Sequence, residues 1–283
     1  MTATNPGKAK PSYGAVVLEK HEFVWIKDYL YKRAGIALND SKQALVSGRL
    51  DKRLRYYGFS SYSEYFRLLD KPGCEQETMM AIDLLTTNET YFFREPKHFD
   101  FLNSHFFAMQ RPSRPLRLWS AASSSGEEAY TLAMLVSEFA NIGQWEIIGT
   151  DISTRMLEKA QMGLYPMSAA EKIPENLLKK YCLKGSCEYD GFFLINSALR
   201  SRVKFIYANL IEQLPDLGHF DVIMLRNVMI YFDMQTKQRL VERIQHNLHP
   251  GGYFIISHSE SLNGMKCDLQ MVAPSIYRKV GAN

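Results

Sequence analysis

The sequence of 283 residues lacks several features that define other classes of protein. No stretch approaches the ~18 uninterrupted apolar residues that a membrane-spanning helix needs, so we expect no insertion into a membrane. Met1–Tyr13 is polar and has no apolar signal core, so we predict a disordered tail over residues 1–15 and a cytoplasmic protein. The cysteines are few and have neither CxxC spacing nor a nearby set of histidines: Cys74, Cys182, Cys187 and Cys267. We therefore expect reduced structural thiols and no metal site.

The net charge is also small, +4, with 34 Lys and Arg against 30 Asp and Glu. A charge of this size does not by itself require a nucleic-acid partner. The whole excess lies in residues 1–80, which hold 13 basic and 9 acidic residues. Much of it falls in Lys42–Tyr57, where the apolar residues share one face at 100° per residue: Val46, Leu50, Leu54 and Tyr57. This spacing predicts a helix that begins after Asn39, Asp40 or Ser41 and ends at Gly58.

The other face of this predicted helix is cationic, with Lys42, Arg49, Lys52, Arg53 and Arg55. Two interpretations stay open at this point. The face is either an ordinary solvated surface or a docking surface for an acidic partner, because clustered positive charge speeds the encounter of oppositely charged molecules. A nucleic acid is disfavoured, since the segment lacks interleaved aromatic residues and a recognisable nucleic-acid-binding motif.

The apolar pattern changes along the chain. From Glu19 to about Asp70 it has helical spacing, which predicts a small helical bundle. After Pro115, short apolar runs alternate with amphipathic stretches of helix length, and these runs predict strands at residues 116–121, 145–149, 203–208, 221–225 and 253–257. This alternation indicates a mostly parallel sheet covered by helices on both faces. In such sheets ligands bind beyond the carboxyl ends of the strands.

The residues that follow the predicted strands have the character of a ligand site. Ser120–Glu128 is rich in small residues and is not a phosphate-binding loop, which favours a nucleotide cofactor without phosphates. Asp151 follows the second strand and is either a ribose ligand, the N-cap of the next helix or both. Asn209 follows the third strand, where its amide can pair with an adenine edge. Arg226 and Asn227 follow the fourth, where two polar side chains are unusual as mere packing. Residues 248–257 add a helix stop, a turn and a late strand. Together and in this order, these features favour S-adenosylmethionine as the cofactor.

The chain resembles the chemotaxis receptor methyltransferases, the CheR family. The resemblance covers about residues 20–280 and is carried by Thr86–Glu95, Trp119–Glu128, Thr150–Ile152, Arg226–Asp233 and His258–Glu260. It implies an α/β fold: a small N-terminal helical bundle and a Rossmann-like S-adenosylmethionine-dependent methyltransferase domain with an inserted small antiparallel β subdomain. We place the helical receptor-docking domain at residues 16–85, the methyltransferase domain at 86–283 and the β subdomain at about 181–202.

The resemblance also implies an activity and its site. The family transfers a methyl group from S-adenosylmethionine to glutamate side chains on the cytoplasmic helices of chemoreceptors, forming glutamyl methyl esters in chemotactic adaptation and leaving S-adenosylhomocysteine. The residues implied to line the cofactor site are Asn88, Thr90, Arg94, Glu128, Asp151, Asn209, Leu210, Arg226 and Asn227. The cationic helix is then implied to touch the receptor. We expect a cytoplasmic monomer, recruited to receptor arrays at the membrane, that binds no nucleic acid.

The reaction needs few acids and bases, because a glutamate with a pKa of about 4.3 is ionised at neutral pH. We expect Arg94 to pair with a carboxylate, either that of the cofactor or that of the incoming glutamate, rather than to be a surface charge. Tyr231 is either a wall of the methyl pocket or a core tyrosine. The resemblance further implies that Glu128 accepts hydrogen bonds from the cofactor's ammonium group and that Asn227 reaches its methionyl or ribose portion.

Two questions stay open at this level. The hairpin predicted from strands at residues 181–184 and 191–196 either is structural or binds a receptor's C-terminal peptide as an added strand. The protein is alternatively a non-catalytic sensor of an adenosine ligand, which needs the same pocket without methyl transfer. A nucleic-acid methyltransferase is disfavoured, because Arg226-Asn-Val-Met stands where such enzymes carry Asn/Asp-Pro-Pro-Tyr/Phe.

Overall fold

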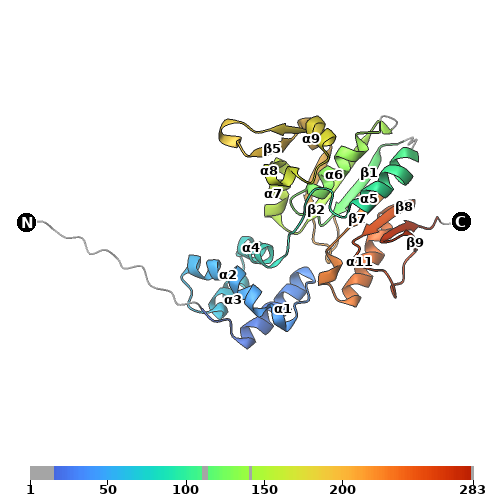
Figure 1. The fold of residues 1–283 in the computed structure, drawn as a ribbon. Helices are drawn as coiled ribbons and strands as arrows, with labels where there is room; N and C mark the ends of the chain where they lie inside the picture. The colour runs from blue at the N-terminus through green and yellow to red at the C-terminus, as the bar shows by residue number, and fades with distance from the viewer. Residues whose placement is uncertain (1–15, 110–113, 140–141, 282–283) are drawn as a thin grey trace, which may run out of the picture.

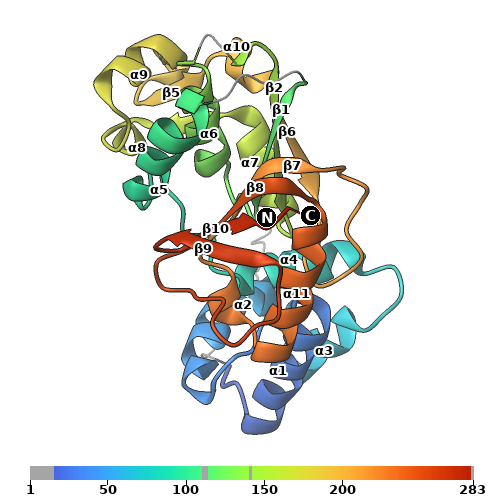
Figure 2. The same ribbon diagram turned by 90° about the vertical axis from the view of Figure 1, so that its right-hand side faces the viewer.

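The computed structural model describes residues 16–109, 114–139 and 142–281, so the predicted tail over residues 1–15 lies outside the described part. A helical bundle occupies one end of the molecule, the main sheet lies in the middle, and a small second sheet lies at the opposite end (Figures 1 and 2). Within the described ranges, no helix combines the length and the apolar character that crossing a membrane would require.

The predicted helical bundle is confirmed. It consists of α1 (Lys20–Ala34), α2 (Gln43–Tyr57), α3 (Tyr62–Leu69) and α4 (Glu75–Leu85), with a 3-10 turn over Asp40–Lys42 before α2. Three residues of the predicted apolar face of α2 are buried, since Val46, Leu50 and Leu54 are each at most 1% exposed. The fourth, Tyr57, is exposed at the end of the helix, where its hydroxyl donates to Glu77. The helix ends at Gly58, which adopts a left-handed conformation with φ 69° and closes the last turn through its backbone N–H.

The main sheet of the described residues has seven strands in the order β6-β2-β1-β7-β8-β10-β9. The bounds are β1 Leu116–Ala121, β2 Trp145–Asp151, β6 Val203–Tyr207, β7 Phe220–Leu225, β8 Leu248–Ile256, β9 Leu269–Ala273 and β10 Ile276–Lys279. The first five strands in this order pair in parallel, which confirms the five predicted strands. The last two are antiparallel additions that the sequence pattern did not reveal. All five residues of β9 are exposed or half-buried, and its apolar residues, Met271–Ala273, make too short a run to mark a strand.

Helices cover both faces of this sheet, as predicted. One face packs α11 (Met234–His246) in the core cluster that also contains the helical bundle. The other face packs α5 (Pro96–Phe101) and α6 (Glu127–Val136) in a second cluster. Two further helices, α7 (Thr154–Met162) and α10 (Ser197–Arg200), lie between strands in the chain. The layers therefore leave the carboxyl ends of β1, β2, β6 and β7 directed toward the helical bundle.

The small sheet is antiparallel, with the order β3-β5-β4. Its strands are β3 (Leu164–Pro166), β4 (Cys182–Lys184) and β5 (Phe192–Ile195), and α8 (Met167–Ala170) and α9 (Glu175–Tyr181) connect the first strand to the second. The two strands predicted here correspond to β4 and β5. The third strand, β3, lies before residue 181, where we expected the subdomain to begin.

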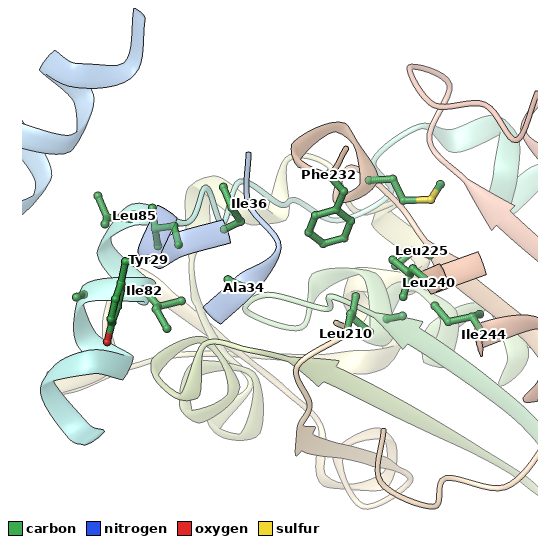
Figure 3. Packing of buried hydrophobic residues seen from close by; sticks show 14 of the residues in the cluster. Tyr29, Ala34, Ile36, Ile82, Leu85, Leu210, Leu225, Phe232, Leu240 and Ile244 are labelled. Atoms are coloured by element: carbon green, nitrogen blue, oxygen red, sulfur yellow. The ribbon is translucent and has the colours of Figure 1, made fainter. Parts of the chain in front are cut away.

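The helical bundle and the main sheet share one hydrophobic core. Figure 3 shows Ile36, Leu85 and Ile82 of the helical part in the same cluster as Phe232, Leu210 and Leu240 of the sheet domain. Hydrogen bonds join the same surfaces: the Asn209 side chain donates to the Arg33 carbonyl at 2.8 Å, and the Ala37 N–H donates to the Tyr231 carbonyl at 2.8 Å. The two parts therefore pack against each other in a continuous interface and are not independent domains joined only by a linker.

Gly35 lies in this interface and tests how closely it is packed. The residue has φ +71°, and a Cβ built on it would lie 2.6 Å from Ile211 Cγ2. We predict that Gly35→Ala destabilises the protein by about 1–3 kcal/mol, because the left-handed conformation is strained for alanine. The expected fall in melting temperature is roughly 2–4 °C per kcal/mol, measured by calorimetry or circular dichroism.

Gly48→Ala is the matched control. Gly48 lies within α2, and a Cβ built on it would have no other atom within 4 Å, so alanine should stabilise the helix by about 0.5–1 kcal/mol. Equal melting temperatures for the two variants would contradict the close packing of the interface.

Candidate functional site

One cavity gathers the predicted site residues. It has a volume of about 360 Å³ and lies between the helical bundle and the carboxyl ends of the parallel strands, walled by residues 34–45, residues 85–94 and the loops after β1, β2, β6 and β7. The structure places all nine predicted cofactor residues on its wall: Asn88, Thr90, Arg94, Glu128, Asp151, Asn209, Leu210, Arg226 and Asn227. Tyr231 lines the same cavity, and of the five predicted docking residues Lys42 does so.

Asp151 is the last residue of β2 and is 6% exposed. Its carboxylate accepts hydrogen bonds from the backbone N–H of Ser153 at 2.9 Å and from that of Ser124 at 2.8 Å. Burial raises the pKa of this carboxyl to about 6, although the two backbone donors favour its ionised form. The N-cap of α7 is Ser153, whose hydroxyl accepts from the Met156 N–H. Asp151 therefore joins two loops at the cavity wall and does not cap the helix.

The small-residue loop after β1 has two different roles. Ala122 and Ser124 line the cavity, and both have positive φ, 64° and 47°. Gly126 instead packs against the protein, because a Cβ there would lie 2.8 Å from the Cβ of Ala160 in α7. The small side chains of Ala122 and Ser124 thus leave room for a ligand in the cavity, whereas the absence of a side chain at Gly126 lets α7 pack closely against the loop.

Arg226 is a buried cation at the end of β7, with a side chain only 2% exposed. Its guanidinium donates to Glu128 Oε2 at 2.8 Å, to the Arg94 carbonyl, and lies 3.2 Å from Glu95 Oε2. The other carboxylate oxygen of Glu128 accepts from the Ser120 hydroxyl at 2.6 Å. Arg226 therefore joins β1, α6 and the turn that carries Arg94, and it lines the cavity from within this network.

Arg94 has a different environment. Its guanidinium donates to the Glu89 carbonyl at 2.6 Å, and within the described residues it forms no ion pair with a carboxylate. Tyr231 lies on the 3-10 turn over Met229–Tyr231, and its ring is only partly buried against the core. An arginine without an acidic partner and a tyrosine on the same cavity wall can receive a carboxylate that comes from outside.

The Asn209 amide is already partly used, because it donates to the Arg33 carbonyl and accepts from the Ile211 N–H at 3.3 Å. One N–H and one lone pair remain for a ligand. Asn227 has φ 58°, and its side chain donates to Ser257 Oγ at 2.9 Å. Both amides therefore hold loops in place as well as line the cavity.

Sequence reasoning missed a second polar group beside Arg226. His98 is fully buried, and Ser275 Oγ lies 3.1 Å from its Nε2 and 2.7 Å from His258 Nδ1. Burial and the charge of Arg226 lower the pKa of His98 to about 3, so the imidazole is neutral. Candidate ligand atoms of Glu95, His98 and His258 lie within 4.8 Å of one another, but the Arg226 guanidinium on Glu95 opposes a cation there. Glu95 and His258 stand in motifs of the resemblance, whereas His98 carried no signal in the sequence.

A second missed residue is Asp83 of α4, which is 4% exposed and faces α7. Arg155 Nε lies 3.5 Å from one of its carboxylate oxygens, and the other oxygen has no hydrogen-bond partner in the described structure. Burial raises the pKa of Asp83, and its negative charge adds to the raised pKa of Asp151. No sequence pattern distinguishes this aspartate from an exposed helix residue.

The cationic face of α2 is not uniform. Arg49 donates to the carbonyls of Leu85 and Thr86, each at 2.9 Å, at the end of α4. Arg53 forms a two-pronged pair with the buried carboxylate of Glu77 in α4. The remaining predicted docking residues are exposed: Lys42, Lys52 and Arg55. Two of the five cations thus hold the bundle together, and three face solvent.

Comparison with known proteins gives the family. Residues 21–86 match the all-alpha domain of CheR methyltransferases, and residues 88–277 match their SAM binding domain. The chain belongs to the CheR methyltransferase family. It is 38% identical over 263 residues to chemotaxis protein methyltransferase 2 of Pseudomonas aeruginosa, covering 91% of this chain and 92% of the relative. The chemotaxis protein methyltransferase of Escherichia coli is 35% identical over 265 residues, covering 93% and 92%. The resemblance seen in the motifs is therefore confirmed, and the protein is an S-adenosylmethionine-dependent methyltransferase.

The cavity has side chains that suit each part of S-adenosylmethionine, the cofactor of the CheR family. The ribose has two hydroxyls that can donate to a carboxylate, and the carboxylate of Asp151 lies at the end of β2 on the cavity wall. The methionyl end carries an ammonium and a carboxylate, and Glu128 and Arg94 supply the opposite charges on the same wall. Ile152 and Leu210 give apolar surface for a base. The residues present therefore fit S-adenosylmethionine.

Asp151 gives a test with a pH dependence. Ribose hydroxyls donate to the ionised carboxylate, and the free carboxyl has a pKa of about 6, so affinity for S-adenosylhomocysteine should fall as the pH drops through 6 and level off above it. We predict that Asp151→Asn lowers the affinity at least about tenfold at pH 8, from the loss of charge-assisted hydrogen bonds. The variant should also lose the pH dependence near 6, as measured by titration calorimetry.

Asp190→Asn is the control, because Asp190 is exposed and lies away from the cavity wall. Its affinity and pH profile should match those of the wild type. An Asp151→Asn variant that binds as tightly as the control at pH 8 would refute the ribose role.

Proposed function

We propose that this protein methylates glutamate side chains of chemoreceptors, forming glutamyl methyl esters in chemotactic adaptation. The observation that carries the proposal is the gathering of all nine predicted cofactor residues, Arg94 among them, and of Tyr231 on one cavity wall. The relatives are named chemotaxis protein methyltransferases, which points to the same process. A non-catalytic sensor would need the nine cofactor residues alone and would have no use for Tyr231 beside them.

The chemistry requires positioning more than proton transfer. S-adenosylmethionine supplies, when bound, a methyl carbon on a positively charged sulfur. A glutamate oxygen forms the new O–C bond while the C–S bond breaks, and the electron pair of that bond stays on sulfur in S-adenosylhomocysteine. No proton moves, because the acceptor is ionised at neutral pH. Alignment of the reacting atoms can supply ~7–11 kcal/mol in well-oriented systems.

Each residue then has a task. Arg94 orients a carboxylate through its guanidinium, which has no competing acidic partner among the described residues. Tyr231 walls the space around the transferred methyl group and limits water near the nucleophile. Glu128 is held by Ser120 and Arg226, so its charge keeps a fixed direction toward the cofactor's ammonium group.

The receptor reaches this cavity along the exposed part of the cationic helix. Lys42, Lys52 and Arg55 are exposed and can meet an acidic receptor helix, although Arg55 also pairs with Asp51 of the same helix at 2.6 Å. Arg49 and Arg53 keep α2 in place on α4. Lys42 belongs to both surfaces, since it also lines the cavity. A substrate helix that follows α2 is thereby led to the cavity mouth.

A second contact with receptors is available at the far end of the molecule. The strand β4 is an edge of the small sheet, and edge strands present unpaired N–H and C=O groups to an added peptide. A receptor's C-terminal peptide added there would recruit the enzyme to receptor arrays while the bundle docks the substrate helix. The small sheet and the bundle lie at opposite ends of the molecule (Figure 2), so both contacts can form on one monomer.

The proposed reaction has a direct test. Incubation with S-adenosylmethionine labelled in its methyl group and with chemoreceptor cytoplasmic fragments should label the receptor, and mild base should release the label as methanol. A fragment with its glutamates replaced by alanine should stay unlabelled. Binding of cofactor without any base-labile label would instead establish a sensor.

The docking surface has a separate test. We predict that Lys52→Glu with Arg55→Glu raises the KM for receptor fragments at least several-fold at low salt, because like charges then face the acidic partner. The difference from the wild type should shrink at high salt. Affinity for S-adenosylhomocysteine should be unchanged, since neither residue lines the cavity.

The matched control is Lys172→Glu with Lys266→Glu, which changes the net charge equally at exposed sites outside the bundle. If this control raises the KM as much as the α2 variant does, general charge and not a docking face governs the encounter.

A further inference from the structure

The turn after β7 carries several residues of the cavity wall, among them Asn227, Ile230 and Tyr231, and it is sharply bent. Asn227 has φ 58°, and a 3-10 turn over Met229–Tyr231 follows at once. Backbone N–H groups in such a bend find no partner in a strand or a helix, and buried donors need acceptors. The conformation of this turn therefore depends on an acceptor from elsewhere in the chain.

Glu260 provides that acceptor. One of its carboxylate oxygens accepts from the Asn227 N–H at 3.1 Å and from the Ser257 N–H at 2.9 Å, and the other accepts from the Ile230 N–H at 3.3 Å. Glu260 follows β8, the strand that pairs with β7. A single carboxylate thus joins the ends of two neighbouring strands at the cavity.

The same carboxylate also acts on the Asn227 side chain. Ser257, whose N–H is held by Glu260, accepts with its hydroxyl from Asn227 Nδ2 at 2.9 Å. Glu260 itself is not on the cavity wall, whereas Asn227, Ile230 and Tyr231 are. Its contacts are with the backbone of the turn, so any influence on the reaction passes through the residues of that turn.

We propose that Glu260 is a positioning residue for methyl transfer, whose ionised carboxylate holds the 227–231 turn so that Asn227 and Tyr231 face the reacting groups. This inference rests on the proposed function and assigns to that site a residue that does not touch cofactor or substrate. Charge-assisted bonds to three N–H groups favour one conformation of the turn over its alternatives. Burial raises the pKa of Glu260, and the backbone donors oppose this by stabilising the charge.

The variant that tests the proposal is Glu260→Gln, which keeps the size of the side chain and replaces one acceptor oxygen with a donor NH₂ group that cannot accept from an N–H. We expect kcat to fall at least tenfold, while the affinity for S-adenosylhomocysteine changes less than threefold, because Asp151 at the ribose end is untouched. Glu158→Gln is the matched control: Glu158 is exposed on α7 and distant in sequence from the turn, and its kinetics should equal those of the wild type.

A double-mutant cycle with Tyr231→Ala separates positioning from general stability. If Glu260 acts through the turn, Glu260→Gln should lower kcat much less in the Tyr231→Ala background than in the wild type. Equal reductions in both backgrounds, or an unchanged kcat in the single variant, would overturn the proposal. So would a kcat and a cofactor affinity that fall by the same factor.

Amide hydrogen exchange decides the same question without any activity. Glu260→Gln should speed exchange of the Asn227 and Ile230 amides at least tenfold and leave α11 unchanged, and unaltered exchange at the turn would overturn the proposal. A wild-type protein that transfers no methyl group would refute the proposed function, and the exchange data would still report whether Glu260 holds the turn.

Discussion

The architecture of the site depends on the buried guanidinium of Arg226. A cation 2% exposed is costly unless it is paired. The two terminal nitrogens of Arg226 have partners from three places: Glu128 at the start of α6, Glu95 before α5, and the Arg94 carbonyl, whereas its Nε has no hydrogen-bond partner among the described residues. Compensating this one charge fixes the end of β7 relative to the loop after β1 and to the segment that leaves the helical bundle. The direction of Arg94 follows, because its own backbone is held by Arg226. Arg94, which can receive an incoming carboxylate, thus depends on Arg226, whose carboxylate partners belong to the chain itself.

The helical bundle completes the cavity. Residues 34–45 form part of its wall, and the Ala37 N–H donates to the carbonyl of Tyr231. Tyr31 also donates to Asp233, the N-cap of α11, at 2.6 Å. In the proposed docking, a receptor that contacts the bundle would act on a surface already bonded to the turn that carries Tyr231. Docking and positioning would then share the same short stretch of chain, in a bundle that packs in one core with the sheet.

The parts of the site that could be predicted from the sequence are those that lie at the carboxyl ends of the parallel strands. Asp151, Asn209 and Arg226 each follow an apolar run, and the carboxyl ends of parallel strands meet at one edge, so their proximity needed no knowledge of long-range packing. The roles of Arg49 and Arg53 could not be predicted in this way, because their partners on α4 lie 24 or more residues away in the chain. His98 and Asp83 give no pattern at all, since burial of a lone polar residue is decided by tertiary contacts. The strands β9 and β10 were missed because each is short and carries a weak apolar signal: β9 is an edge strand without a fully buried residue, and β10 has four residues, of which only Ile276 and Tyr277 are buried.

Two buried carboxylates of this site show how similar surroundings serve different ends. Asp151 and Glu260 each accept from backbone N–H groups, and burial raises the pKa of both. Asp151 lies on the cavity wall, so its remaining lone pairs are available to a ligand and we expect its protonation to change binding. Glu260 lies behind the wall, and its three bonds to N–H groups are directed at the chain itself. A reaction that moves no proton needs charges that stay fixed while the acceptor approaches, and backbone donors are well suited to hold them because they neither titrate nor move with the ligand.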